Sequence, residues 1–156
     1  MRFVLDTSSL INLRELEWLD LLKNPEDIFL CPEKVEQELQ RKKRKNNEIF
    51  KLSEEGVLSI LSVSHPIVFS ALSNTDSDAI SLALENNSTV VSEDGLLREN
   101  AIRYGVPAID IAGILLIFYQ EGRIDKSDCL SRLKVLFENQ ILSKSRYYQL
   151  LISLRS

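Results

Sequence analysis

Short apolar segments recur through the first 109 residues, and each is followed by a stretch with helical spacing. These segments are too short for helices and suit buried strands. Strands that alternate with helices are typical of βαβ units, so the pattern predicts an α/β protein with a central, mostly parallel sheet. The predicted strands are residues 3–5, 28–30, 57–63, 89–91 and 106–109.

Helices are predicted between these strands, several of them with a capping residue at the start and two with a glycine at the end. Ser8 or Ser9 is expected to cap the first helix. Pro32 suits the first turn of the second, which is predicted to continue through the basic residues 41–45. The others are predicted at 48–55 before Gly56, at 66–72, at 76–85 with Asn74 or Thr75 as its cap, and at 94–104 before Gly105.

From residue 111 onward the pattern is helical throughout. Ile111, Ile114, Leu115 and Phe118 recur at the spacing of one helix face. Two further stripes are expected to pack in the core with them, and a homodimer face on one stripe is a second interpretation. The chain, 1–156, is therefore predicted to be one domain with residues 111–156 as a helical C-terminal extension packed on it. The further stripes are Leu130, Leu133, Leu136 and Phe137, and Tyr147, Leu150, Leu151 and Leu154.

The composition is that of a globular protein. The chain has 156 residues, of which 44% are hydrophobic and 27% charged, and these shares exclude disordered and fibrous proteins. Cys31 and Cys129 lie far apart and match no metal-binding spacing, so both are expected to be buried thiols. The first apolar run is too short for a signal peptide, and residues 114–119 are too few to cross a bilayer. A cytoplasmic location without membrane attachment is expected.

Four acidic residues lie at positions where an α/β sheet binds its ligands. In a parallel sheet, ligands bind beyond the carboxyl ends of the strands. Asp6 directly follows the strand at 3–5, and Asp94 closely follows the strand at 89–91. Glu38 and Asp76 lie on predicted helices that could face the same edge. We therefore expect these four carboxylates to lie close together.

A cluster of carboxylates points to a bound cation. Neighbouring carboxylates raise one another's pKa and destabilise the fold unless a cation neutralises them. Oxygen ligands without histidine suit Mg²⁺ or Mn²⁺ better than Zn²⁺. Because such a cation activates water and stabilises charge on phosphoryl oxygen, phosphodiester hydrolysis is the reaction that fits best. Taken singly, each acid also has an ordinary explanation: Asp6 and Asp94 as helix caps, Asp76 at a helix N-terminus and Glu38 as solvated surface.

The order of these acids resembles that of the PIN-domain nucleases. The matching segments are FVLDTSSLINL, CPEKVEQEL, LSNTDSDAISLALE and TVVSEDGLLRENAIRYGV, roughly the first two-thirds of the chain. The resemblance implies a three-layer α/β/α fold and a ribonuclease that depends on Mg²⁺ or Mn²⁺. It implies that Asp6, Glu38, Asp76 and Asp94 are the catalytic acids, and that Asp6, Asp76 and Asp94 are the metal ligands.

The resemblance also assigns supporting residues. Ser8 matches a small polar residue that supports the first aspartate, and Ser92 matches a hydroxyl two residues before the last one. Two assignments stay open, because Asp78 competes with Asp76 and Glu36 competes with Glu38; spacing favours Asp76 and Glu38. The role of Glu93 is also open.

The family's prokaryotic members of this size indicate partners. They include VapC-type toxins, which cut RNA and are held inactive by an antitoxin. The resemblance therefore implies an RNA substrate and an antitoxin protein as the partners of this chain.

Charge bears directly on an RNA substrate. The net charge is −4 and the pI about 5.1, and an acidic protein is a poor general binder of nucleic acid. Binding would have to rely on metal and on local basic patches. The strongest basic run is either a phosphate-contact patch beside the acidic site or a solvated helix end. Its residues are Arg41, Lys42, Lys43, Arg44 and Lys45.

Other functional classes lack their residues. His65 is the only histidine, and the chain contains neither a GxSxG motif nor a glycine-rich nucleotide loop. A haloacid-dehalogenase-like phosphatase, the alternative Asp-based phosphoryl hydrolase, needs Asp-x-Asp after the first strand, whereas Asp6-Thr7-Ser8 lacks the second acid. A PIN-like binding module without catalytic activity is the alternative from a different class.

Overall fold

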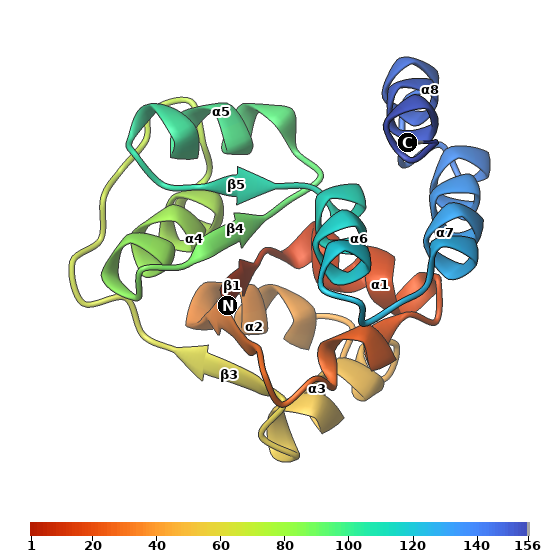
Figure 1. Ribbon diagram of the computed structural model, residues 1–156. Helices are drawn as coiled ribbons and strands as arrows, with labels where there is room; N and C mark the ends of the chain where they lie inside the picture. Colours follow the sequence, from red (N-terminus) through yellow and green to blue (C-terminus); the bar gives the residue numbers. More distant parts are fainter. Residues whose placement is uncertain (156) are drawn as a thin grey trace. The chain divides into compact units, whose positions relative to one another are not determined.

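The structure, a computed structural model, describes residues 1–155. The chain divides into two compact units, Met1–Ile109 and Asp110–Ser156. The first combines strands with helices and the second is helical (Figure 1). The organisation as a single domain with a packed extension stays a prediction. The first unit contains β1 (Arg2–Leu5), α1 (Thr7–Glu15), the 3₁₀ helix η1 (Leu19–Leu22), β2 (Ile28–Pro32), α2 (Glu33–Gln40), α3 (Asn47–Glu54), β3 (Leu58–Leu61), α4 (Asn74–Glu85), β4 (Thr89–Val91), α5 (Gly95–Arg103) and β5 (Ala108–Ile109).

One sheet of five strands forms the centre of the first unit. The strand order is β3–β2–β1–β4–β5, and every neighbouring pair is parallel. The predicted mostly parallel sheet is therefore confirmed. The chain adds strands on one side of β1 and then returns to add β4 and β5 on the other side. Ligands bind at such a switch point, beyond the carboxyl ends of the two central strands.

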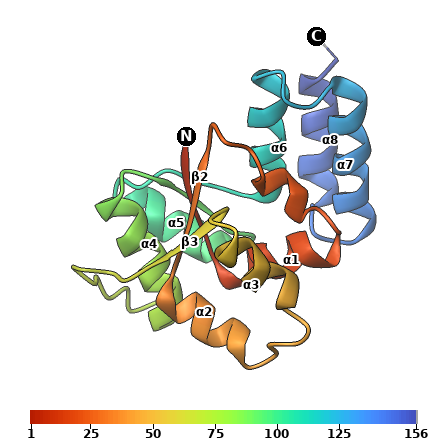
Figure 2. The same cartoon turned by 90° about the horizontal axis from the view of Figure 1, so that it is seen from below.

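Helices cover both faces of this sheet. Helices α1, α2 and α3 lie on one face, and α4 and α5 lie on the other (Figures 1 and 2). Val4 and Leu30 of the sheet pack with Ile80 of α4 in a buried cluster, while the rings of Phe3 and Phe29 stack at 5.4 Å between centroids. Because both faces are covered, each strand is apolar along most of its length, which explains the short apolar runs in the sequence.

The second unit consists of α6 (Ile111–Gln120), α7 (Lys126–Glu138) and α8 (Lys144–Ser153). The predicted stripe on α6, from Ile111 to Phe118, is buried. Asp110 caps α6 by accepting the Gly113 N–H at 2.8 Å, and both of its oxygens accept hydrogen bonds from Arg146 at 2.8 and 2.9 Å. This pair connects the start of α6 to α8. None of the helices within residues 1–155 is long and apolar enough to cross a membrane.

Two segments predicted to be helical are not. Residues 66–72 form no helix, because the N–H groups of Ile67 and Phe69 instead donate to the hydroxyls of Ser81 and Ser77, at 2.9 and 3.2 Å. These bonds hold the segment along α4. Helix α2 ends at Gln40, so the basic residues 41–45 form turns and not the predicted end of that helix.

The caps of two helices also differ from the prediction. Asp6 caps α1 in place of Ser8 or Ser9, and Ser73 caps α4 in place of Asn74 or Thr75. In both helices the observed cap lies before the predicted one. The predicted cap residues are wrong because several neighbouring residues in each segment are good helix caps.

Both cysteines are free and buried, as predicted. Burial, and to a smaller degree the charge of Glu36, raises the pKa of Cys31 to about 12. A thiol with such a pKa stays protonated and unreactive at neutral pH.

Candidate active site

Asp6 lies at the carboxyl end of the central strand β1 and is buried, with 3% of its surface exposed. Its Oδ1 accepts the Ser9 N–H at 2.9 Å, which makes it the cap of α1. The Ser8 hydroxyl donates to the carboxylate at 3.2 Å, and the Ser92 hydroxyl donates to Oδ2 at 2.5 Å. The two serines predicted to support the site therefore both contact Asp6.

Ser92 connects Asp6 to the next strand of the sheet. Leu5 of β1 pairs with Val91 of β4, so the residues that follow these strands emerge side by side. The Ser92 hydroxyl donates to Asp6 and accepts the Asp94 N–H at 3.0 Å. Asp94 then caps α5, with its Oδ1 accepting the N–H groups of the next turn. A short path of hydrogen bonds thus runs from the first acid to the last.

Glu38 reaches this edge from α2. Its Oε2 accepts a hydrogen bond from the Thr7 hydroxyl at 2.8 Å, and Thr7 is the residue directly after Asp6. The sequence reasoning missed Thr7. Its place next to the first acid was the available signal, because a residue there begins the helix that follows the same strand end.

Asp76 on α4 completes the set. Its pKa is raised mainly by burial, then by the negative charges of Asp6 and Asp94, and to a smaller degree by Glu38. A hydrogen bond with Ser73 acts in the opposite direction. The structure therefore brings all four predicted acids close enough for their charges to interact, although they come from four separate segments.

The geometry separates the competing acids. Asp78 is buried, and its Oδ2 lies 3.4 Å from Nζ of Lys34 on α2, so its charge is compensated by that lysine. Glu36 lies near Cys31, whose pKa its charge raises. By contrast, Asp76 and Glu38 both belong to the interacting set. The contacts favour Asp76 over Asp78 and Glu38 over Glu36.

The donor set fits a hard divalent cation by its chemistry, although the carboxylates stand apart from one another. Across residues 1–155, no three histidine, cysteine, aspartate or glutamate side chains lie close enough to hold a metal ion. Carboxylates without a neutralising cation repel one another, and both oxygens of Asp6 are engaged by serine hydroxyls. In the described part of the chain, Oε1 of Glu38 and Oδ2 of Asp94 accept no hydrogen bond, which leaves oxygens for a cation or for water.

Two of the four acids also serve as helix caps. Asp6 and Asp94 are both helix caps, as the capping preference of aspartate would give. Capping alone does not account for the position of Glu38 or for the interaction of three negative charges with Asp76. Capping therefore explains the positions of two of the four acids and leaves the other two to be explained.

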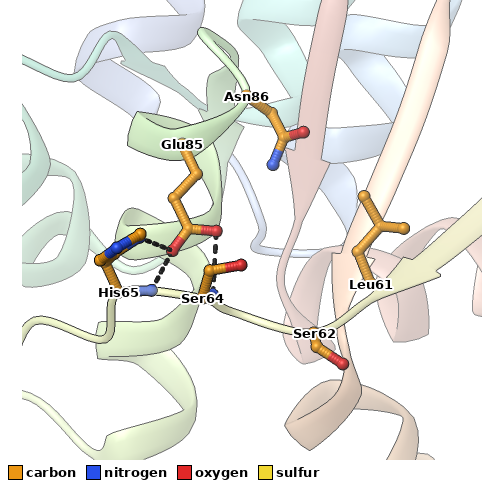
Figure 3. Close-up of a pocket in the computed structure, with 6 residues that line it drawn as sticks. All are labelled: Leu61, Ser62, Ser64, His65, Glu85 and Asn86. Carbon is orange, nitrogen blue, oxygen red and sulfur yellow. Dashed lines mark hydrogen bonds and ion pairs between the residues drawn. The ribbon is translucent and has the colours of Figure 1, made fainter.

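A pocket of about 500 Å³ lies elsewhere in the same unit, between β3 and the end of α4, and none of the four acids lines it (Figure 3). Glu85 accepts the N–H groups of Ser64 and His65 there, at 3.1 and 2.5 Å. Both carboxylate oxygens of Glu85 therefore hold the loop after β3 against α4. We assign this pocket a structural role, because its one carboxylate is used in holding the loop.

Comparison with known proteins identifies the family. The family model DUF3368, described as a PIN domain, matches residues 2–156. The chain belongs to the PIN-domain family. PIN domains are generally nucleases, so the acids at the strand ends of this PIN domain lie on a nuclease-type fold. No curated protein matched the chain by sequence.

Solved structures share the fold of this PIN domain. It is similar to a PilT N-terminus domain protein from the archaeon Sulfolobus solfataricus, with a TM-score of 0.56, 23% identity, and 74% of this chain and 92% of that one covered. A domain of a functionally unknown protein from Methanocaldococcus jannaschii has a TM-score of 0.53 and 17% identity over 70% of this chain and 90% of that one. The PIN domain endonuclease Utp24 has a TM-score of 0.52 and 17% identity over 70% of this chain and 84% of that one.

The basic run of the PIN domain forms a turn between α2 and α3, and we name it the basic turn. All five of its residues are exposed. Within the described residues, none of their side chains forms a hydrogen bond or an ion pair, so their charges are available to solvent or to a ligand. Arg98, on α5, instead donates to the Ser92 carbonyl at 2.7 Å. The basic turn comprises Arg41, Lys42, Lys43, Arg44 and Lys45.

Proposed function

We propose that this PIN domain is a metal-dependent endoribonuclease that hydrolyses phosphodiester bonds of RNA. One observation carries the proposal: where β1 and β4 end, the Ser92 hydroxyl donates to Asp6 and accepts the Asp94 N–H, and Glu38 bonds to Thr7, the residue after Asp6. These acids come from separate segments and lie toward the edge of the sheet where α/β proteins bind ligands. The cost of repulsion between carboxylates is offset when a cation binds, which gives the arrangement a chemical purpose.

The donor atoms suggest a division of roles. Asp6, Asp76 and Asp94 would hold Mg²⁺ or Mn²⁺, which supplies a water of lowered pKa and neutralises charge on the phosphate. Ser8 and Ser92 orient the carboxylate of Asp6 by donating to it. Such partners fix a metal ligand in position.

Glu38 is suited to proton transfer. Its Oε2 is held by Thr7, so Oε1 is the atom that would accept a proton from the attacking water. The water oxygen forms the new bond to phosphorus, the bond to the leaving ribose oxygen breaks, and solvent protonates that oxygen. The proton of the attacking water thus has an acceptor, and the leaving oxygen has a source of a proton.

The finer assignments follow from the family resemblance. A PIN domain of this length that cuts RNA in the cytoplasm would need restraint, and an antitoxin protein is the partner that the VapC-like toxins imply. Pairing of two copies of the chain would be compatible with that role. These parts of the proposal rest on resemblance, whereas the nuclease assignment rests on the acids.

Incubation of the purified protein with total cellular RNA tests the proposal. We expect internal cleavage with Mg²⁺ or Mn²⁺ and none with a chelator, because the acids need a cation to act. RNA that stays intact with either metal would contradict the assignment. If intact RNA were nevertheless bound, the protein would be a binding module on a nuclease fold.

A further inference from the structure

The basic turn is held in one conformation by hydrogen bonds from both sides. The Lys42 N–H donates to the Leu39 carbonyl at 3.2 Å, and the Asn46 N–H donates to the Lys42 carbonyl at 3.0 Å. The Asn46 side chain is buried and its Nδ2 donates to the same Leu39 carbonyl at 2.9 Å. The end of α2 and the start of α3 are thereby connected across the turn.

Arg14 ties the basic turn to α1. Its Nη1 donates to the Lys45 carbonyl at 3.1 Å and also contacts Oδ1 of Asn46, while only 8% of its side chain is exposed. Burying an arginine is costly unless its donors are satisfied. Here three of its contacts are to Lys45, Asn46 and the adjacent Glu15. A buried cation is therefore used mainly to hold a surface turn made of five other cations.

This arrangement is unexpected for a turn whose only role is solubility. Consecutive like charges repel, so a free turn of this composition would be mobile. Fixing the backbone of such a turn costs conformational entropy. Because folding has already met that cost, an anionic ligand that binds the turn need not meet it again.

Helix α1 indicates how far the Lys45 end of the basic turn lies from Glu38. Thr7, which binds Glu38, begins α1, and Arg14, which binds the turn, lies near its end. Seven residues of helix span about 10 Å at ~1.5 Å per residue. A single RNA strand covers that length within a few nucleotides.

We infer that the basic turn, positioned by Arg14 and Asn46, binds phosphates that flank the cut site and not the phosphate that is cut. The inference rests on the proposed ribonuclease function and adds a requirement for substrate length. The RNA strand must extend a few nucleotides beyond the acids to reach Arg44 and Lys45. Arg14 and Asn46 are positioning residues, since they act on the ligand through the turn.

Binding of labelled RNA tests the inference without cleavage. The probes are fluorescein-labelled single-stranded oligouridylates, one too short to span both sites and one about four times longer, measured by fluorescence anisotropy with a chelator present. We expect the double variant Arg44→Gln/Lys45→Gln to lose affinity for the long probe. The slope of log K against log salt concentration should become shallower by about 1.4, because two phosphate contacts on a single strand are lost. The matched control Lys134→Gln/Lys144→Gln removes the same charge from α7 and α8 and should bind as the wild type does.

A second variant separates position from charge. Asn46→Ala leaves all five cations in place and removes the contacts of Arg14 and Leu39 with the Asn46 side chain, so we expect several-fold weaker binding of the long probe. Arg14→Lys keeps the charge but loses the fork geometry, and its affinity should fall between those of the wild type and Asn46→Ala. If Asn46→Ala fails to fold, the result for Arg44→Gln/Lys45→Gln decides the question.

The outcomes distinguish this inference from the proposed function. Equal losses in the Arg44/Lys45 variant and in the control, or equal wild-type affinity for both probes, would overturn the inference while leaving metal-dependent cleavage untouched. Absence of cleavage by the wild type would instead overturn the ribonuclease proposal, and the binding data would still decide whether the basic turn contacts RNA.

Discussion

Replacing Asp6 by asparagine is expected to reduce RNA cleavage by roughly 10²–10³-fold, the range for removing one group that stabilises transition-state charge. The substituted side chain would keep an oxygen for the Ser9 N–H, and asparagine is as good a helix cap as aspartate. The charge available to a cation, however, would be gone. We therefore expect the metal-free protein to melt within about 4 °C of the wild type.

Cleavage rate and melting temperature, measured on the same preparations, check this prediction. Asp20→Asn is a matched control, because it makes the same chemical change on an exposed side chain of η1. It should leave both quantities unchanged. A large fall in the melting temperature of Asp6→Asn without metal would show that Asp6 serves mainly as a structural cap.

The pair Asp76→Asn and Asp78→Asn is expected to give opposite results. Asp76 interacts with the other three acids, so its replacement should cause a loss of cleavage similar to that of Asp6→Asn. Asp78 pairs with Lys34, and its replacement should retain cleavage within a few-fold while lowering stability by about 1 kcal/mol. Single-turnover cleavage assays of both variants decide between them. The reverse pattern would move the site acid to Asp78.

Stability as a function of pH gives Asp76 a second measurement. Its folded-state pKa lies above its ordinary value of 3.8, so its contribution to stability is present below pH 3.8 and is lost as the pH rises through the folded pKa. Asp76→Asn removes this loss. Without metal, the melting temperature of that variant relative to wild type should therefore be higher at pH 7 than at pH 4. A difference independent of pH would mean that neither burial nor the neighbouring charges raise the pKa of Asp76.

The sheet could be predicted because its central strands β1, β2 and β4 are buried along most of their length. Segments such as those around Val4, Leu30 and Val90 must be apolar throughout, so each can be recognised in the sequence as a short apolar run. Their alternation with helices then limits the topology to a parallel sheet with right-handed crossovers. The strand order itself was not deduced, since it depends on how the connections pack.

Loop segments and helix ends were less predictable because their partners are distant in sequence. The segment 66–72 has some helical character, but hydrogen bonds to Ser77 and Ser81 of α4 determine its course. The prediction of helix for the basic turn is wrong because nothing local in the sequence shows that Asn46 bonds back to Leu39 or that Arg14 reaches it. Each error reflects a contact between separate segments.

The four acids also differ in how far the sequence alone locates them. Asp6 and Asp94 follow strands, so the end of each strand locates them in the sequence. Glu38 and Asp76 lie on helices that could face the same edge, but helix faces depend on packing, and only spacing typical of the family favours them over Glu36 and Asp78. Lys34 and Thr7, which separate Asp78 from the set and bring Glu38 into it, became visible only in the structure.

Calorimetric titration of the protein with Mn²⁺ tests most directly whether the four carboxylates form one cation site. The wild type should bind Mn²⁺ saturably, and the double variant Asp6→Asn/Asp94→Asn should show no comparable binding although it remains folded. Binding of equal affinity in both proteins, or no binding by the wild type, would contradict the account.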